Sequence, residues 1–592
     1  MATAASPRWD VARVVPLLVV AGAVAFGLVE LRSELHLVAY TNDSSMHEEM
    51  VRFAASQLRA GHLPMRSWFP YLNLGSPDFL HYQSLGATLT GAAGLLVGPN
   101  HAFVWSLYLL LATWPVSIYA SARCFGLDRM AAAGAAACAP FVVSRLGIGY
   151  ETTSYLAIGF GLWSQLVAMW TLPLAWGTTW QAVHRGRFWR LAPVLVALTV
   201  ACHFMTGYLA IGVIVLWPFL ARDGFVGRLR RAGQTLLLSG FLAAWVIVPL
   251  VVLKPYASID EFLAHGPDVS SYGARSALRW LVDGQLLDAH RLPVLTALGG
   301  LGLLAALLGR LRDAGHRAIL AALVGSLVLF FGKPTLGPLI VLVPGHADLF
   351  MRRFLMGVQL AAILFAGVGV GALARAGAHG LRALSAHGQA RLAHPTVAGA
   401  LGVAALVALL SPAWQQAMAV DTGGGGTLPE SNAAWIAAQA KADATAGHQV
   451  DALVALARSH GPGRIYAGMP SNWGIDFEVG GVPVFRYLAS LDVEEVGFTN
   501  RTASLMSDPE AYFDQYVPGD YTLFGIRYLL LPSSMAPPVP ARRLATRGSY
   551  ALWTVGDTTL VGVVDTVGPP VVATRRDLGA ANARFLESPL ST

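Results

Sequence analysis

Long apolar segments recur along most of this chain, and they limit what it can fold into. Segments of about 17 to 25 residues cross a hydrocarbon core about 30 Å thick, where only a helix satisfies its own backbone hydrogen bonds. Charged residues make up 13% of the 592 residues, whereas about one-quarter is usual in soluble domains. The sequence therefore predicts a polytopic α-helical membrane protein.

The apolar segments predict eleven spans. The first is a retained span, because it is too long for a signal-peptide core and lacks a small-residue cleavage site. The run at 85–98 is short for a span: either it re-enters from the outer side, or it crosses and another short segment does not. The total is about 11–13. Residues 191–221 lie between two basic loops and predict a tight hairpin whose turn, near His203, points outward. The predicted spans are 12–30, 101–121, 130–147, 154–178, 191–203, 205–221, 233–252, 292–309, 318–332, 353–373 and 396–412.

The distribution of charge predicts how these spans are oriented. Short basic connections mark the cytoplasmic face, so the formal net charge of +7 indicates orientation rather than nucleic-acid binding. We expect a multi-pass protein of a bacterial plasma (inner) membrane, because the composition is rich in Ala and Arg and poor in Lys. Its N-terminus lies in the cytoplasm and, because eleven is odd, its C-terminal part lies outside. The basic connections are 184–190, 222–231, 310–317 and 375–391, and acids lie on the others, near Asp43, Glu151 and Asp260–Glu261.

Composition also predicts the domain organisation. Residues 1–412 form the transmembrane domain, with a first extracytoplasmic loop at 31–83, and the glycine-rich residues 413–432 form a linker. Residues 433–592 form a small extracytoplasmic α/β domain, with a helix at 433–459 and β-like runs at 464–468, 521–532, 550–555 and 560–567. The three cysteines lie in or beside apolar segments, so neither a disulfide framework nor a zinc site is expected.

Within the first outer loop, residues 41–50 carry four ionisable residues and no lysine or arginine: Asp43, His47, Glu48 and Glu49. Ser45 and Glu48 match a helix capping box, and acids suit a helix N-terminus, so Glu48 and Glu49 are interpreted mainly as a helix start. Asp43 is either the cap or a functional acid. If the helix starts by Asp43, His47 lies on the same face.

Other polar residues are predicted on the same outer side of the membrane. Glu151 follows two glycines, and it either pairs with Arg145 or belongs to a site. His203 is a satisfied core histidine or, at the hairpin tip, part of the site. Arg352 and Arg353 break the positive-inside rule, which favours an anion such as a lipid phosphate bound to their planar donors.

These residue types suit the transfer of a sugar from a polyprenyl-phosphate carrier. A carboxylate takes a proton from the acceptor hydroxyl, and cations stabilise the departing lipid phosphate. Base and cation have to meet at one membrane surface, because the donor lipid lies in the bilayer.

The first outer loop also resembles that of the GT-C superfamily of membrane glycosyltransferases. An acid follows the first span, and a run of Gly, Pro and aromatic residues leads to the next apolar segment. The closest likeness is to the multi-pass family labelled pyruvoyl-tetrahydropterin-synthase-related, and 524–532 resembles a strand of such outer domains. The matching residues are Gly61, Pro64, Trp68, Pro70, Gly75, Pro77 and Tyr82.

The resemblance implies that Asp43 takes the catalytic-acid position of GT-C enzymes and that Arg352 or Arg353 serves the donor phosphate. Together with the outer-face residues it predicts an inverting glycosyltransferase with Asp43 as the base, joined by His47 and Glu151. Arg352, Arg353 and His203 would bind the donor phosphate, and the acceptor would be a glycan, lipid or protein. Many GT-C enzymes carry paired acids, whereas Asp43 is followed by two serines. If a divalent cation (Mg²⁺ or Mn²⁺) takes part, Asp43 and Glu48 are its candidate ligands, and no other cofactor is expected.

Two other interpretations stay open. One is a protein that binds or transports lipid-linked glycans without catalysis, although a transporter would place its ionisable residues near the midplane on broken helices. The other is a GT-C-like scaffold that keeps the fold and binds partners through its C-terminal domain, because a fold does not fix a function.

Overall fold

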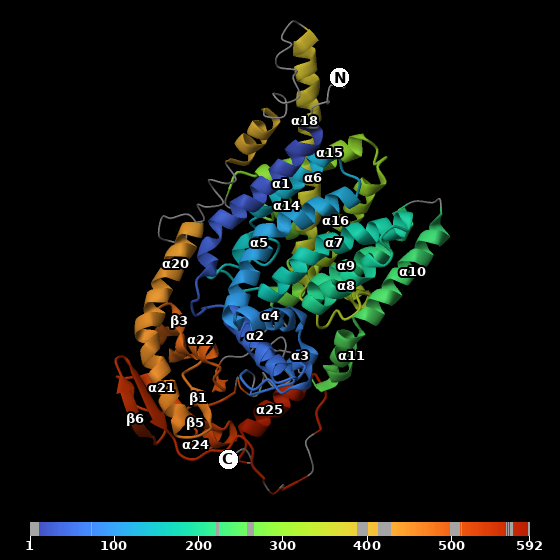
Figure 1. The fold of residues 1–592 in the computed structure, drawn as a ribbon. Helices are drawn as coiled ribbons and strands as arrows, with labels where there is room; N and C mark the ends of the chain where they lie inside the picture. The colour runs from blue at the N-terminus through green and yellow to red at the C-terminus, as the bar shows by residue number, and fades with distance from the viewer. Residues whose placement is uncertain are drawn as a thin grey trace. The chain divides into compact units, whose positions relative to one another are not determined.

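The computed structural model divides into two compact units (Figure 1). The first comprises Met1–Arg32, Leu107–Ala243 and Pro267–Ser431, and the second Ser33–Ser106, Ala244–Gly266 and Asn432–Thr592. The structure describes residues 11–72, 74–220, 224–256, 266–289, 291–386, 401–411, 428–497, 510, 512–563, 565, 567–568 and 572–589. Asp260, Glu261 and most of the predicted linker lie outside these residues, and 428–432 already belong to a helix.

The first unit is helical, and α18 (Leu355–Ala386) packs against three other helices, α6, α15 and α16. Small residues allow this close packing: a Cβ added to Gly302 in α15 would meet the Phe365 carbonyl oxygen of α18. The other helices are α1 (Val11–Glu30), α5 (Pro99–Cys124, which starts in the second unit), α6 (Arg129–Cys138), α7 (Trp163–Arg185), α8 (Leu191–Cys202), α9 (Phe204–Leu216), α10 (Phe225–Leu242), α13 (Pro267–Ser270), α14 (Gly273–Val282), α15 (Val294–Leu308), α16 (Ala314–Phe331) and α17 (Lys333–Leu336).

Several of these helices suit a bilayer. Among the residues that the structure describes, four helices are long and apolar enough to cross a membrane, or five if α10 and the following α11 (Ala244–Leu253) form one broken span. The four are Arg13–Glu30, Pro99–Cys124, Ala314–Phe331 and Met351–Gly380, and shorter apolar helices cover Leu85–Val97, Leu191–Cys202, Phe204–Leu220, Val294–Leu308 and Leu401–Ser411. The polytopic helical fold is confirmed, whereas the count of 11–13 stays a prediction.

Two predicted spans are wrong in extent. Instead of helices at 130–147 and 154–178, α6 ends at Cys138 and α7 begins at Trp163. The segment between them is irregular because side chains from helices form the hydrogen bonds that its backbone groups would otherwise make within a helix. Gln165 donates to the carbonyl oxygens of Ile148 and Gly149 at 3.1 Å, and the Tyr150 amide donates to Gln359 at 2.6 Å. Non-helical backbone at this position therefore needs no bulk water.

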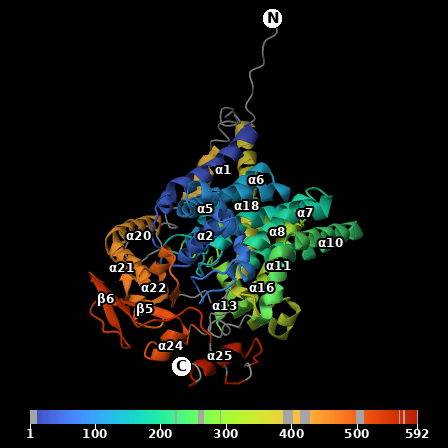
Figure 2. The same ribbon diagram turned by 60° about the horizontal axis from the view of Figure 1, so that its bottom comes forward.

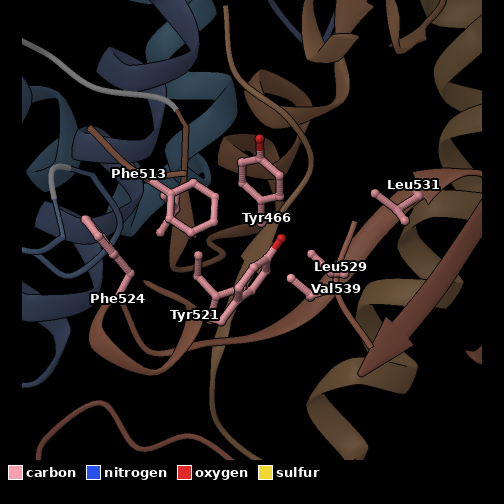
Figure 3. Close-up of a cluster of buried hydrophobic side chains, with 9 residues drawn as sticks. Tyr466, Phe513, Tyr521, Phe524, Leu529, Leu531 and Val539 are labelled. Carbon is pink, nitrogen blue, oxygen red and sulfur yellow. The ribbon is translucent and has the colours of Figure 1, made fainter. Parts of the chain in front are cut away.

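The second unit contains a five-stranded sheet in the order β4-β1-β5-β7-β6, in which β4, β1 and β5 are parallel and β7 and β6 antiparallel. An aromatic cluster that includes Tyr466, Phe513 and Tyr521 packs with Leu529 of β5 (Figure 3). Helix α21 contacts β6 and β7, and two views show α20 leading into it (Figures 1 and 2). The elements are α20 (Leu428–Ala442), a π-helical turn (Asp443–Gly447), α21 (His448–Ser459), β1 (Arg464–Tyr466), β2 (Glu478–Val479), β3 (Val482–Pro483), α22 (Val484–Tyr487), β4 (Glu495–Val496), α24 (Pro518–Leu523), β5 (Ile526–Pro532), β6 (Arg542–Arg547), β7 (Tyr550–Thr554) and α25 (Leu578–Leu586).

The first outer loop belongs to this second unit together with the C-terminal residues. It forms α2 (Ser44–Arg59), α3 (Asp78–His81) and α4 (Leu85–Val97), and α2 packs against α4. The Ala39 amide donates to Asp443 at 2.9 Å, and Arg52 donates to Asp492 at 2.8 Å. Sequence positions about 400 apart are thus held together by hydrogen bonds.

The C-terminal predictions are partly confirmed. The helix at 433–459 and the strands at 464–468 and 550–555 are present, whereas 521–532 divides into the short helix α24 and the strand β5. Pro518 occupies the first turn of α24, where its missing N–H costs nothing. The predicted strand at 560–567 is wrong for the residues of this run that the structure describes, because none of them pairs with a strand.

Candidate active site

Asp43 is the N-cap residue of α2, and it is exposed. Its side chain makes no capping hydrogen bond, because Asn42 takes that role by accepting from the Ser44 amide at 3.0 Å. The Ser45 hydroxyl donates to the Asn42 carbonyl oxygen at 2.9 Å. The predicted capping box of Ser45 and Glu48 is therefore wrong, since the helix begins at Ser44. The carboxylate of Asp43 stands at a helix N-terminus, where the dipole favours negative charge.

Glu48 and Glu49 are buried next to Arg52. Arg52 pairs with Glu48 at 3.4 Å and with Asp492 at 2.8 Å. Burial raises the pKa of Glu48 to about 7 although Arg52 opposes the shift, and burial raises the pKa of Glu49 well above its ordinary range. Among the described residues, neither carboxyl oxygen of Glu49 has a hydrogen-bond partner. Both acids are buried and inaccessible to a substrate, whereas Arg52 links α2 to Asp492 of the same unit.

His47 follows Asp43 by one helical turn, as predicted for a helix that starts by Asp43. Its amide donates to the Asp43 carbonyl oxygen at 3.1 Å, and its ring stacks on Tyr82 with the centroids 6.3 Å apart. Burial lowers the pKa of His47 to about 3, so the ring is neutral at pH 7. A buried neutral imidazole is poorly placed to take a proton from a substrate, and its catalytic role stays a prediction.

The sequence interpretation missed Arg486, which lies in α22 of the C-terminal domain. Arg486 donates to the Thr41 carbonyl oxygen at 2.8 Å, two residues before Asp43. Burial lowers the pKa of Arg486, and the negative charges of Asp43 and Glu495 oppose that shift. No local pattern marks this arginine, because only the packing of α22 brings it to the loop.

Asp43 and Glu48 do not fit a shared cation. Five positions along an α-helix turn by about 140° around its axis, so the two side chains leave on different sides. Glu48 is also engaged by Arg52. Within the described residues, no group of three or more His, Cys, Asp or Glu side chains is arranged to hold a metal ion.

Glu151 belongs to the first unit and is fully buried. It accepts hydrogen bonds from the Ser144 hydroxyl and, at 3.0 Å, from Gln359. Burial raises the pKa of Glu151, and these hydrogen bonds oppose the shift. The expected pair with Arg145 is wrong, because the Arg145 guanidinium lies 4.5 Å from the centroid of the Trp280 ring.

Arg353 is linked by hydrogen bonds to the segment between α6 and α7, which contains Glu151. It donates to Gln165 at 2.9 Å, and Gln165 in turn donates to the Gly149 carbonyl oxygen and the Tyr155 hydroxyl. The structure thus places Glu151 and Arg353 around one segment, an arrangement that the sequence predicted only as a shared membrane face.

Arg352 and His203 each interact with another residue of the first unit. Arg352 forms an ion pair with Asp268. His203 is the N-cap of α9, where its Nδ1 accepts from the Thr206 amide at 3.3 Å. The hairpin turn at His203 is confirmed, but capping occupies one ring nitrogen, so its phosphate role stays a prediction.

An apolar hollow lies beside the same connection of the first unit. It is lined by α1 and α5, by residues 140–143, and by Thr152, Thr153 and Leu156. Glu30 is its only ionisable lining residue among those that the structure describes. Its apolar wall next to Glu151 suits the hydrocarbon chain of a lipid.

Solved structures of other proteins share this fold. The Archaeoglobus fulgidus oligosaccharyltransferase in the apo form matches with a TM-score of 0.52 at 13% identity, over 87% of this chain and 69% of that chain. The same enzyme tethered to an acceptor peptide with the NVT sequon matches with a TM-score of 0.52 at 12% identity, over 87% and 68%. ArnT from Cupriavidus metallidurans bound to undecaprenyl phosphate gives a TM-score of 0.47 at 14% identity, over 93% and 99%.

No protein-family model matches the sequence. None of the curated proteins matches it either. The likeness to the oligosaccharyltransferase shows the fold, which is the GT-C fold that the first outer loop predicted. The likeness to the pyruvoyl-tetrahydropterin-synthase-related family stays a prediction.

Proposed function

We propose that this chain transfers a sugar, with inversion, from a polyprenyl-phosphate donor to a glycan, lipid or protein acceptor at the outer face of the membrane. The observation that carries the proposal is the exposed Asp43 at the start of α2, in a fold shared with an oligosaccharyltransferase. That enzyme has been captured with an acceptor peptide tethered to it. The neighbouring acids Glu48 and Glu49 are buried, so Asp43 alone of these three carboxylates is open to an acceptor.

Asp43 acts as the general base. Its carboxylate accepts the proton of the acceptor hydroxyl from about 3 Å, and the resulting oxygen attacks the anomeric carbon of the sugar. The bond from that carbon to the lipid phosphate breaks on the opposite side, which inverts the configuration and releases polyprenyl phosphate. Asp43 interacts electrostatically with Arg486, which donates to the Thr41 carbonyl oxygen two residues before it.

Arg352 and Arg353 bind the donor phosphate, and the hollow between α1 and α5 takes part of the lipid chain. Phosphate binding at Arg352 has to displace Asp268 from its ion pair. Asp268→Asn should therefore strengthen the binding of polyprenyl phosphate, whereas Arg352→Ala and Arg353→Ala should weaken it. Unchanged binding in all three variants would remove the arginines from the mechanism.

The test of the base uses purified chain in lipid vesicles with a panel of synthetic polyprenyl-phosphate hexoses and candidate acceptors. Mass spectrometry measures the release of polyprenyl phosphate. Asp43→Asn should lower the rate about 10²- to 10⁴-fold, the usual contribution of a general base. Asp313→Asn is the matched control, because Asp313 is also an N-cap aspartate without a side-chain cap bond, and its side chain is 79% exposed.

Two results would contradict the proposal in different ways. An Asp43→Asn rate equal to the wild type would show that another group is the base. Binding of polyprenyl phosphate without release from any donor of the panel would favour the non-catalytic scaffold.

A further inference from the structure

The C-terminal domain carries a basic hollow that sugar transfer at Asp43 does not explain. It has a volume of about 440 Å³ and lies where the C-terminal end of α21 meets the start of β6 and the end of β7. Its walls include three basic side chains, His460, Arg527 and Arg542, and one acid, Asp557. Hollows of a few hundred Å³ are the usual size of small-ligand sites.

The two arginines have donors to offer. Arg542 is exposed, and within the described residues its guanidinium makes no hydrogen bond or ion pair. Arg527 donates to Asp557 at 2.9 Å and to the Pro462 carbonyl oxygen at 3.5 Å, and its side chain is 20% exposed.

The position of Arg542 indicates more than the protection of an edge strand from pairing with other chains. Charged side chains on an edge strand such as β6 commonly serve only to prevent pairing with other chains. Arg547, at the far end of β6, fits that role, since it is exposed and outside the hollow. Arg542 instead lines the hollow together with Arg527 of β5 and with His460 at the end of α21.

We propose that this hollow binds the carboxylate-bearing part of an acidic saccharide, such as a uronate of the acceptor glycan. Guanidinium groups match a carboxylate with paired donors. The apolar walls Leu544 and Val555 suit the C–H face of a sugar ring, and Thr554 and Asp557 suit its hydroxyl groups. Only the assignment of the saccharide to the acceptor rests on the proposed function.

Calorimetry on the purified full chain tests the proposal with trigalacturonate and its fully methyl-esterified form, which has nearly the same shape without the charge. The acid should bind at least about tenfold more tightly than the ester. Arg542→Ala should weaken binding of the acid by a similar factor, and Arg547→Ala, from the same strand, should leave it unchanged. Arg527→Lys keeps the charge and the aliphatic stem but loses the planar fork, so it should also weaken binding.

Three results would overturn the proposal: equal binding of the acid and the ester, equal effects of Arg542→Ala and Arg547→Ala, or full competition by inorganic phosphate at the same concentration. Binding of phosphatidylglycerol vesicles through Arg542 without binding of trigalacturonate would also overturn it, in favour of a lipid headgroup. Asp43→Asn should bind trigalacturonate like the wild type. Failure of transfer and failure of saccharide binding are therefore distinguishable.

Discussion

Asp78 provides a quantitative test of how this chain tolerates buried charge. It begins α3 in the first outer loop, its side chain is buried, and its Oδ1 has no hydrogen-bond partner in the part of the chain that the structure describes. Burial alone raises its pKa from 3.8 to about 7. That difference corresponds to about 4 kcal/mol of stability, at 1.36 kcal/mol for each tenfold change in proton affinity.

Whether the free energy of unfolding rises or falls with pH depends on whether the folded or the unfolded chain ionises at the lower pH. Below pH 3.8 the carboxyl is protonated in both the folded and the unfolded chain, so the stabilisation is fully present. As the pH rises toward 7, the unfolded chain ionises while the folded one stays protonated, and the free energy of unfolding falls. Asp78→Asn cannot ionise, so it should escape this loss.

Urea unfolding of the purified chain in mild detergent, followed by tryptophan fluorescence at pH 5 and pH 8, measures the effect. The stability advantage of Asp78→Asn over the wild type should grow by about 2 to 3 kcal/mol between these pH values. Asp476→Asn is the control, because it makes the same substitution at an exposed position of the same unit. An Asp78→Asn variant less stable than the wild type at pH 8 would refute the reasoning, since it would mean that Asp78 is ionised and paired.

Two further predictions concern packing and a histidine. Gly302→Ala places a methyl group against the Phe365 carbonyl oxygen and should destabilise the first unit by about 1 to 3 kcal/mol in thermal unfolding, whereas Gly300→Ala, which meets nothing within 4 Å, should not. For His47, whose pKa burial lowers from 6.5 to about 3, the stabilisation present above pH 6.5 should be lost as the pH falls. Relative to His47→Asn, the wild type should lose about 1.6 kcal/mol of unfolding free energy between pH 6.5 and pH 5; a difference between the two proteins that does not change with pH would contradict the burial of this ring.

The apolar segments predicted the helices well where lipid or apolar packing alone decides them. The expected span 12–30 corresponds to α1, and the hairpin around His203 lies between α8 and α9. The prediction failed between Cys138 and Trp163, where hydrogen bonds from distant glutamines replace helical ones. Hydropathy contains no information about such partners.

Strands were predicted from apolar and aromatic runs, and this rule fails for edge strands that carry charged residues. It found β7, but it missed β6, which carries Arg542, Arg543 and Arg547 among its six residues. An edge strand gains its order from the ladder with its neighbour and carries charge to avoid pairing with other chains. A strand of this kind therefore does not show the apolar pattern that identifies inner strands.

Accessibility separates the candidate base from the other acids of the same loop, and accessibility is a property of tertiary packing. Asp43 and Glu48 are both acids near one helix start, yet Arg52 and Asp492 enclose Glu48 while Asp43 stays exposed. Asp492 lies more than 400 positions further along the chain, so no local motif could predict this enclosure. Proton transfer requires an approach to about 3 Å, which burial denies to Glu48 whatever its pKa. If Glu48→Gln lowered transfer, the loss would therefore act through the position of α2, and its size should follow the change in stability rather than the pH of the assay.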